Sequence, residues 1–357
     1  MFTELLFAAI TLTAPADGAT AEILSEAQRS YLALPRAERL AKFDDGAFRK
    51  ALAKDGDGPQ SVRLEWKGDT NQVYLLAVED SIFAVSNRCY ARITNLEPGK
   101  TYGWSVRIPG EFDNVSSSSF TVAPTLPRLM YAEGVHNLRD CGGWKGVGGR
   151  RVRFGRLFRS AGLRNSARKS GDSLLNVRYS PGGRRVTDSG LAALKDDLGI
   201  KTDIELRSLK EAMCMKSSLI PEARWVHVPF LAYDFIDDDV KGRLQFVKIF
   251  RQLLKEENYP VLFHCSGGRD RTGTVSFLLL GLLGVAEDDL LRDWEATAFG
   301  DSALSFGSSR IIRLLDYLAT RHGKDINARI ENYVRSCGIS EKEIAAFREL
   351  MLEGGAR

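Results

Sequence analysis

Short apolar segments recur through the first third of the chain, and polar turns separate them. Residues 62–66 alternate between apolar and charged side chains, which is the period of a strand that buries one face. Further apolar segments occupy residues 73–78, 90–93, 102–106 and 118–122. Several short strands joined by turns are typical of a β-sandwich. The pattern therefore predicts an all-β domain over residues 1–125, followed by a proline-bearing linker at about 123–130.

Two features of the first 60 residues modify this picture. Residues 22–56 show helix-like periodicity broken by polar residues, so we expect a helical insertion within the first domain. Residues 10–13 are either a first strand or part of a signal peptide that is cleaved near residues 19–21. We favour the strand, because the extreme N-terminus carries Glu4 and no Lys or Arg. The two alternatives for location are secreted or periplasmic, which we prefer, and cytoplasmic.

A predicted corner of the sandwich resembles one in fibronectin type III domains. Residues 96–102 read Leu-Glu-Pro-Gly-Lys-Thr-Tyr, and in that family the phenol of such a tyrosine ties down a strand crossing. Trp66 lies where such domains often carry a core tryptophan. The resemblance implies a fibronectin type III-like sandwich, and a generic hairpin is the alternative. The sequence identifies no partner for this domain.

The remaining two-thirds of the chain alternate between helix-like and strand-like segments. Thr187 is placed to cap a helix, and strand-like segments follow at residues 202–206 and 225–229. Alternation of this kind predicts an α/β domain over residues 126–357. We expect a central, mostly parallel sheet flanked by helices, with the site at the carboxyl ends of the strands.

Two helices near the end of the chain are predicted from their apolar faces and caps. The first covers residues 240–254 and is expected to bury Leu244, Val247, Phe250 and Leu254. The second is the last helix of the chain. It begins at a capping box formed by Ser340 and Glu343.

Ten residues, His264 to Gly273, carry the clearest chemical signal. They read His-Cys-Ser-Gly-Gly-Arg-Asp-Arg-Thr-Gly and lie between the apolar runs 261–263 and 275–285. A buried strand, a tight loop and a buried helix direct backbone N–H groups and the positive helix end at one point, where an anion can bind. The same field lowers the pKa of a thiol, so we expect Cys265 to be a thiolate nucleophile at neutral pH. A buried structural cysteine is the alternative.

The other loop residues have expected parts in holding a phosphoryl group. Arg271 can hold two phosphoryl oxygens through its planar fork. Thr272 can donate a hydrogen bond to the sulfur and help it depart. The residues between the cysteine and the arginine are expected to bind phosphate; they are Ser266, Gly267, Gly268, Arg269 and Asp270. This arrangement resembles the signature loop of the cysteine-dependent phosphatases.

Four more segments, in this order, strengthen the resemblance: residues 136–143, 155–161, 198–200 and 204–208. They contain Asn-Leu-Arg-Asp-Cys-Gly-Gly, Gly-Arg-Leu-Phe-Arg-Ser, Leu-Gly-Ile and Ile-Glu-Leu-Arg-Ser. With the loop, they are similar to a bacterial family of tyrosine and dual-specificity phosphatases, some of which act on phosphoinositides. The match covers roughly residues 130–352. It implies supporting parts for His264, Glu205, Arg207, Asn137, Arg139 and Asp140.

The chain departs from that family at a few positions. Leu138 stands for a phenylalanine and Cys141 for a leucine, which are changes of packing. Glu205 replaces an aspartate at the end of a strand. Arg269 replaces the lysine of the loop, which keeps the charge but changes its shape.

A cysteine phosphatase needs a carboxylic acid for the leaving oxygen, and the sequence offers several. Asp234 lies 31 residues before Cys265, on the loop after residues 225–229. The resemblance implies an acid on that loop at a similar distance. The other candidates are Asp237, Asp238, Asp239, Glu205 and Asp270. The choice stays open at this point.

Three residues near the loop have alternative parts. Glu205 with Arg207 is more typical of a buried brace beneath the site. Asp270 could position Arg271 or a water molecule. We expect His264 to hydrogen-bond around the cysteine backbone and sulfur.

Composition limits the cofactors and partners. The 357 residues, 44% hydrophobic and 27% charged, suit two or three globular domains. A net charge of +4 suits anionic substrates but is too diffuse to indicate nucleic acid binding. The five scattered cysteines and four separated histidines show no ligand spacing, so neither a metal nor another cofactor is implied. The apolar stretch at 274–285 is too short for an integral membrane segment.

These observations predict a protein-tyrosine or dual-specificity phosphatase that works through a phosphocysteine. The substrate is then a phosphorylated protein. A phosphoinositide or inositol polyphosphate phosphatase is one alternative, because Arg269 adds positive charge to the loop. A catalytically inactive phospho-binding module is another. An inactive loop usually loses its cysteine or arginine, and this loop keeps both Cys265 and Arg271.

Overall fold

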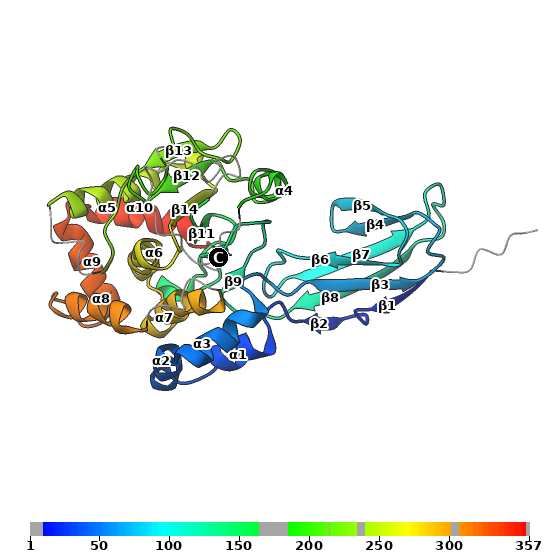
Figure 1. Cartoon of the computed structure of the whole chain (residues 1–357), viewed down its shortest axis with the longest axis horizontal. Helices are drawn as coiled ribbons and strands as arrows, with labels where there is room; N and C mark the ends of the chain where they lie inside the picture. The colour runs from blue at the N-terminus through cyan, green and yellow to red at the C-terminus, as the bar shows by residue number, and fades with distance from the viewer. Residues whose placement is uncertain (1–9, 164–184, 214, 234–239, 301–306, 355–357) are drawn as a thin grey trace, which may run out of the picture. The chain divides into compact units, whose positions relative to one another are not determined.

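The computed structural model describes residues 10–163, 185–213, 215–233, 240–300 and 307–354 (Figure 1). Contacts between residues divide the chain into two units. The first consists of Met1–Ser25 and Pro59–Leu126, and the second of Glu26–Gly58 and Pro127–Arg357. The helical residues expected within the first domain are therefore inserted into it in sequence, but they pack with the second unit.

Two β-sheets make up the first unit, with strand orders β1-β3-β6 and β2-β8-β7-β4-β5. The strands are β1 (Thr11–Ala14), β2 (Ala19–Ala21), β3 (Val62–Lys67), β4 (Tyr74–Val78), β5 (Ser81–Val85), β6 (Tyr90–Ile93), β7 (Thr101–Arg107) and β8 (Ser116–Val122). Every segment predicted from its apolar pattern forms a strand. The first predicted strand forms as β1, which pairs with β3. The pattern missed β5, because four of its five side chains are exposed and no buried face marks it.

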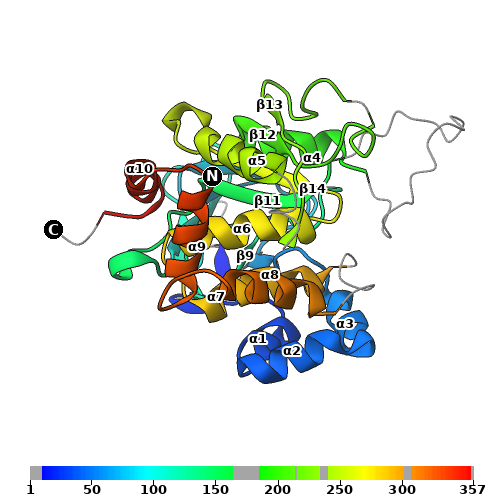
Figure 2. The ribbon, with the colours of Figure 1, turned by 90° about the vertical axis from the view of Figure 1, so that its left-hand side faces the viewer.

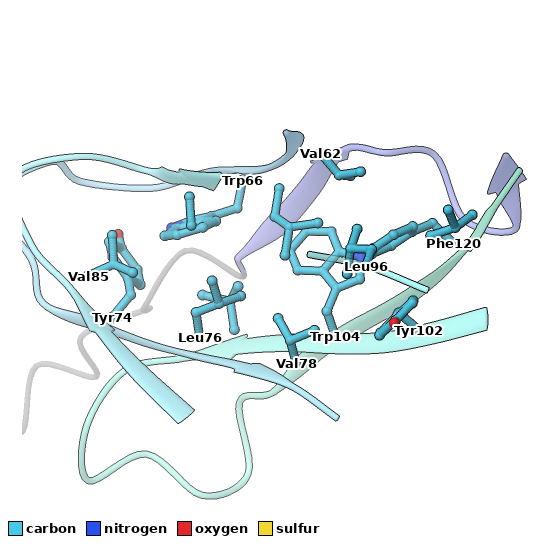
Figure 3. Close-up of a cluster of buried hydrophobic side chains, with 14 of the residues drawn as sticks. Val62, Trp66, Tyr74, Leu76, Val78, Val85, Leu96, Tyr102, Trp104 and Phe120 are labelled. Atoms are coloured by element: carbon cyan, nitrogen blue, oxygen red, sulfur yellow. The ribbon is translucent and has the colours of Figure 1, made fainter. Parts of the chain in front are cut away.

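One hydrophobic cluster lies between these two sheets (Figure 3). Trp66 of β3 is almost fully buried there, and its ring lies 5.4 Å from the ring of Tyr74 in β4. At the predicted corner, the hydroxyl of Tyr102 accepts a hydrogen bond from the N–H of Glu97 at 2.8 Å. The alternation of β3 and β7 thus supplies the inward-facing side chains of the core.

A six-stranded sheet forms the centre of the second unit, in the order β13-β12-β14-β11-β10-β9. Its strands are β9 (Arg128–Leu129), β10 (Arg139–Asp140), β11 (Leu157–Ala161), β12 (Thr202–Glu205), β13 (Arg224–His227) and β14 (Val261–Cys265). The four strands from β13 to β11 run parallel, whereas β10 is antiparallel to both of its neighbours. The predicted mixed α/β domain is confirmed, and the carboxyl ends of the four parallel strands meet at one edge.

Helices cover both faces of this sheet (Figure 2). They are α4 (Asp188–Ala192) with its continuation η3 (Ala193–Asp197), α5 (Val240–Gln252), α6 (Asp270–Leu282), α7 (Glu287–Glu295) with η6 (Ala296–Phe299), α8 (Ser309–Ala319), α9 (Ile326–Ser336) and α10 (Glu341–Met351). Short helical turns form η2 (Val147–Gly149) and η5 (Glu256–Asn258). Helix α6 packs on β14 and β11, and Leu194 of η3 packs with Phe158 and Leu262 on the other face. No helix in the described ranges is long and apolar enough to cross a membrane.

The two predicted helix caps are confirmed, but the buried face of α5 differs from the prediction. Thr187 accepts a hydrogen bond from the N–H of Gly190, and Ser340 forms its capping box. Leu244 is exposed, whereas Phe246 and Phe250 are fully buried. On an α-helix about 200° separate residues 244 and 246. The aromatic rings that pack on α5 lie on the side of Phe246 and Phe250, so this side forms the core.

The helical insertion consists of α1 (Glu26–Leu32), α2 (Arg36–Asp44), α3 (Gly46–Leu52) and η1 (Ala53–Asp55). Both figures of the whole chain show these helices beside α7. Arg39 and Glu295 form an ion pair at 2.7 Å with both side chains fully buried, and the rings of Phe43 and Trp294 lie 4.9 Å apart. Breaking a buried ion pair leaves an uncompensated charge. These contacts explain why the insertion belongs to the second unit.

Candidate active site

The signature loop connects the last residue of β14 to the first turn of α6. Cys265 ends the strand and is 2% exposed, and Arg271 is the second residue of the helix. The helix begins at Asp270, so its positive end faces the loop. This is the strand–loop–helix arrangement that the two apolar runs predicted. An anion bound here would meet the thiol, the loop amides and the helix end together.

Three consecutive carbonyl groups of the loop are held by donors from outside it. The pairs are Gly162 N to Ser266 O at 3.2 Å, Asn137 Nδ2 to Gly267 O at 3.0 Å, and Arg159 Nη2 to Gly268 O at 2.8 Å. In a planar trans peptide, the following N–H points opposite to the carbonyl. The N–H groups of residues 267, 268 and 269 therefore point away from these donors, toward the open side of the loop. They can bind phosphoryl oxygens there without reorganising.

Gly268 is required by the backbone of the loop. Its φ is +70°, a conformation that residues with a side chain rarely adopt. A Cβ atom at this position would also lie 2.6 Å from the backbone of Ser160 in β11. The close approach of loop and strand therefore depends on glycine.

Arg271 is paired with a residue that the sequence analysis did not select. Its two terminal nitrogens donate to the two carboxylate oxygens of Glu211, each at 2.8 Å, and one of them also donates to the Ser266 hydroxyl at 3.2 Å. The hydrogen bond from Arg271 holds the pKa of Glu211 at about 2, with smaller contributions from Ser208 and against the effect of burial. Glu211 is therefore a carboxylate at neutral pH and holds the guanidinium in one orientation.

Asp270, the first residue of α6, is held as a carboxylate. Its oxygens accept from the Tyr233 hydroxyl at 2.6 Å and from Arg269 at 3.1 and 3.2 Å, and Arg310 lies 3.6 Å away. Burial alone would raise the pKa of Asp270, but Arg269, Tyr233 and Arg310 together lower it. The predicted phosphate-binding residue Arg269 is itself 3% exposed and directs its fork to Asp270.

A buried ionic cluster supports two of the residues that donate to the loop carbonyls, Arg159 and Asn137. Asp293 of α7 accepts hydrogen bonds from Arg159, Arg139 and Ser276, and all four side chains are fully or almost fully buried. Burial and the neighbouring charge of Arg159 lower the pKa of Arg139 to about 10, and Asp293 opposes this shift. Arg139 is therefore charged at neutral pH. Arg139 also donates to the Asn137 side chain, so the cluster reaches the loop through two residues.

His264 makes a different contact from the one expected. Its Nε2 lies 2.7 Å from a carboxylate oxygen of Asp203 in β12, whereas a contact with Cys265 was expected. Successive side chains of a strand point to opposite faces, which turns His264 away from Cys265. Burial would lower the pKa of His264, but Asp203 and Glu205 outweigh it and raise the pKa overall.

The predicted brace of Glu205 and Arg207 is confirmed. The carboxylate of Glu205 accepts from Arg207 Nε at 2.9 Å and Nη2 at 2.5 Å, and both residues are buried. Burial would raise the pKa of Glu205, but His264 and Arg207 lower it overall. Glu205 is therefore ionised at neutral pH and does not carry a proton to deliver.

Of the remaining predicted residues, Asp140 lies apart from the loop, Thr272 directly follows Arg271 in α6, and several acid candidates lie outside the described ranges. Asp140 is fully buried and accepts from Arg128 and from the N–H groups of Gly142 and Gly155, so it braces the segment after β10. Thr272 is fully buried, and its hydroxyl has no hydrogen-bond partner among the described residues. The acid candidates Asp234, Asp237, Asp238 and Asp239 lie outside the described residues.

One missed residue had a signal in the sequence. Glu211 follows Ser208 by three positions, as in a capping box, and its carboxylate accepts from the N–H and the hydroxyl of Ser208. Arg159 lies in a segment that the sequence analysis quoted, but its contact with Gly268 depends on the pairing of β11 with β14. Asp293 had no signal. Among the described residues, no group of three His, Cys, Asp or Glu side chains is arranged to hold a metal ion.

A family model described as the tyrosine phosphatase family matches residues 130–180 and 180–353, which is more than half of the chain. The chain belongs to the tyrosine phosphatase family. A protein of Cupriavidus necator, provisionally named a tyrosine-protein phosphatase, is 28% identical over 208 residues, which cover 50% of this chain and 68% of that protein. A tyrosine-protein phosphatase of Nostoc commune is 26% identical over 219 residues, covering 48% and 72%.

The crystal structure of TpbA from P. aeruginosa is similar over 52% of this chain and 88% of that chain, with 16% identity and a TM-score of 0.31. A score of this size is too low to support the assignment. The family model, the relatives and the loop geometry support it instead. The chain is a phosphoric monoester hydrolase of the tyrosine phosphatase type.

Proposed function

We propose that this chain is a protein-tyrosine or dual-specificity phosphatase in which Cys265 is the nucleophile and Arg271 holds the phosphoryl group. One observation carries the proposal. Donors outside the loop hold the carbonyls of residues 266–268, so the backbone N–H groups of residues 267–269 face an anion between Cys265 and Arg271. Donors fixed in this way stabilise charge as it develops on the transferring phosphoryl group.

In the first step, the Cys265 sulfur attacks phosphorus and the bond to the leaving oxygen breaks. An acid donates a proton to that oxygen, and the enzyme is left as a phosphocysteine. Arg271 keeps its orientation through Glu211 while its remaining N–H groups hold the phosphoryl oxygens. We assign the Thr272 hydroxyl to the sulfur, because it is buried and has no other hydrogen-bond partner in the described part of the chain.

We propose Asp234 as the acid. Two of its rivals, Asp270 and Glu205, are held ionised by neighbouring positive charges and by hydrogen bonds, so neither has a proton to donate at neutral pH. Tyr233 donates its hydroxyl to Asp270 and its backbone N–H to Thr274. Asp234 follows Tyr233, a residue anchored at the loop, directly in the chain. In the second step, the resulting carboxylate accepts a proton from the water that hydrolyses the phosphocysteine.

Protein substrates are favoured over phosphoinositides by one observation. The phosphoinositide alternative relies on extra positive charge from Arg269, yet this side chain is almost fully buried and directed at Asp270. A substrate panel tests the choice. Phosphotyrosine, phosphoserine and phosphothreonine peptides are compared with phosphoinositides and inositol phosphates, and preference for the last two groups would overturn it.

Cys265→Ser tests the mechanism. We expect this variant to lose turnover of an aryl phosphate and to keep phosphate binding, because the hydroxyl is a far weaker nucleophile than the thiolate. Cys337→Ser, a substitution at a half-buried cysteine away from the loop, is the matched control and should keep full activity. Vanadate should inhibit the wild-type enzyme. Full activity of Cys265→Ser would refute the nucleophile, and loss of phosphate binding with it would show a damaged loop.

For the first unit, we propose a fibronectin type III-like domain. Its two sheets share one core, and the hydrogen bond from the N–H of Glu97 to Tyr102 supports the tyrosine-corner reading of residues 96–102. The two-sheet arrangement favours this over a lone hairpin. Tyr102→Phe tests the corner, because it removes the phenol oxygen and keeps the ring.

A further inference from the structure

The helical insertion contributes a carboxylate to the support of the signature loop. Asp57 follows η1 near the end of the insertion and is half-buried. Its Oδ2 accepts a hydrogen bond from the backbone N–H of Asn137 at 2.6 Å and lies 3.5 Å from Nδ1 of His136. Asn137 is the residue whose side chain donates to the Gly267 carbonyl. Asp57 is thus connected to the phosphate-binding loop through a single residue, Asn137.

The side chain of Asp57 is closely packed against neighbouring backbone. A Cβ atom on Gly300 would lie 2.7 Å from Oδ2 of Asp57, so a side chain at residue 300 would displace this carboxylate from its present position. Asn137 has a φ of +53°, in the left-handed region that residues with a side chain rarely adopt and that asparagine tolerates better than most. A hydrogen bond to its N–H helps to hold that backbone conformation.

Asn137 converts this backbone support into loop geometry. With the backbone held by Asp57, the side-chain amide donates through Nδ2 to Gly267, while its oxygen accepts from Arg139. The carbonyl of Gly267 and the N–H of Gly268 belong to one rigid peptide plane. The direction of that N–H, one of the expected phosphate ligands, therefore depends on Asn137.

We propose that Asp57 is a positioning residue for the phosphate-binding loop, acting through Asn137, and that residues 26–58 are part of the catalytic unit rather than an accessory of the first unit. The proposal extends the phosphatase function stated above and rests on it. It predicts that removal of one carboxylate in the insertion impairs phosphate binding and turnover.

The experiment compares two alanine variants of the same insertion in the full-length protein. Asp57→Ala removes the acceptor for Asn137. Asp45→Ala is the matched control: Asp45 also accepts backbone N–H groups, from Ala47 and Phe48 at the start of α3, but it does not contact the loop support. Both variants should lower the melting temperature. Only Asp57→Ala should lower kcat on an aryl phosphate, by about 10- to 100-fold, because a small misplacement of positioned groups costs that much.

Asp57→Asn should restore kcat to within a few-fold of wild type, because its amide oxygen can accept the same N–H. In an Asn137→Ala background, Asp57→Ala should have little further effect on kcat, since the two residues act in series. If Asp57→Ala does not fold, Asp57→Ser, whose hydroxyl is one bond too short, replaces it. Kinetics equal to those of Asp45→Ala, or full additivity with Asn137→Ala, would overturn the proposal.

A second measurement separates this proposal from the phosphatase function itself. Inorganic phosphate should protect Cys265 from alkylation by iodoacetamide, and half-protection in Asp57→Ala should need at least about tenfold more phosphate. This readout requires no turnover. A wild-type protein that hydrolyses no phosphate ester but shows this difference would refute the function and leave the positioning role intact. Equal protection in wild type and Asp57→Ala would refute the positioning role.

Discussion

Glu211→Gln provides a direct test of how Arg271 is oriented. The substitution keeps the size of the side chain and removes its charge. Glu211 accepts two hydrogen bonds of 2.8 Å from Arg271, and its side chain is 39% exposed. Glutamine retains only one acceptor oxygen, and its amide N–H groups would face those of the guanidinium. We therefore expect Arg271 to lose its fixed orientation.

The magnitude follows from the geometry of the pair. A hydrogen bond between charged groups contributes about 1.5–3 kcal/mol, and exposure of more than a third of Glu211 brings the estimate for the pair down to about 1–2 kcal/mol. At about 1.4 kcal/mol for each factor of ten, this predicts a loss of about 5- to 30-fold in kcat/KM. The affinity for vanadate should fall in parallel, because the oxyanion uses the same guanidinium.

The assay measures kcat/KM on an aryl phosphate and the inhibition constant of vanadate. Glu222→Gln is the matched control, because Glu222 also pairs with a cation, Lys195, but at the surface and away from the loop. A Glu211→Gln enzyme with the kinetics of Glu222→Gln would refute the orienting role. Tighter vanadate binding in Glu211→Gln would refute it in another way, by showing that Glu211 competes with the phosphoryl group for Arg271.

Stability should show a matching dependence on pH. The pKa of Glu211 in the native state, about 2, is lower than its ordinary value of 4.5. The pair therefore stabilises the folded protein fully above about pH 4.5, and this contribution is lost as pH falls toward 2. Glu211→Gln should lower the melting temperature at pH 7, and the difference from wild type should shrink as pH falls below 4.5. A difference that is constant between pH 7 and pH 3 would contradict the argument.

Two further variants test other parts of the molecule. Asp234→Asn should lower kcat by about 10²–10⁴-fold on substrates with poor leaving groups and much less on substrates with good leaving groups. If Asp234→Asn leaves kcat unchanged while Asp270→Asn or Glu205→Gln shows this dependence on the leaving group, the acid lies on another segment. Tyr102→Phe should destabilise the first unit by about 1–3 kcal/mol, because the N–H of Glu97 loses its partner; thermal unfolding measures this, and aryl phosphate turnover should stay unchanged, so a drop in turnover would show that the two units are coupled.

Features that depend on neighbouring residues were predicted from the sequence. Cys265 and Arg271 are six positions apart, so a strand, a tight loop and a helix bring them together without help from the rest of the chain. The caps at Thr187 and Ser340 are local for the same reason. The brace of Glu205 and Arg207 spans two residues at the end of one strand. In each case the relevant contact lies within one turn or one strand.

Features that depend on packing were not predicted or were predicted wrongly. Two of the donors that hold the loop carbonyls, Asn137 and Arg159, lie more than 100 positions before the loop, and their contacts require the order of strands in the sheet. His264 contacts Asp203 because the two side chains share a face that only the pairing of β12 with β14 defines. The exposed Leu244 shows the same limit, since periodicity locates an apolar face but not the neighbour that covers it.

The sequence by itself therefore determined the chemistry, and the tertiary structure decided how that chemistry is held in place. A cysteine and an arginine in one short loop, the proposed nucleophile and phosphate-binding residue, are recognisable because their geometry is set by local backbone conformation. Arg159 of β11 and Glu211 of the segment after β12 contact that loop directly, whereas Asp57 of the insertion and Asp293 of α7 support it through Asn137 and Arg159. Contacts between segments so far apart depend on which surfaces become buried together. That outcome is a property of the whole folded unit and cannot be read from any one segment.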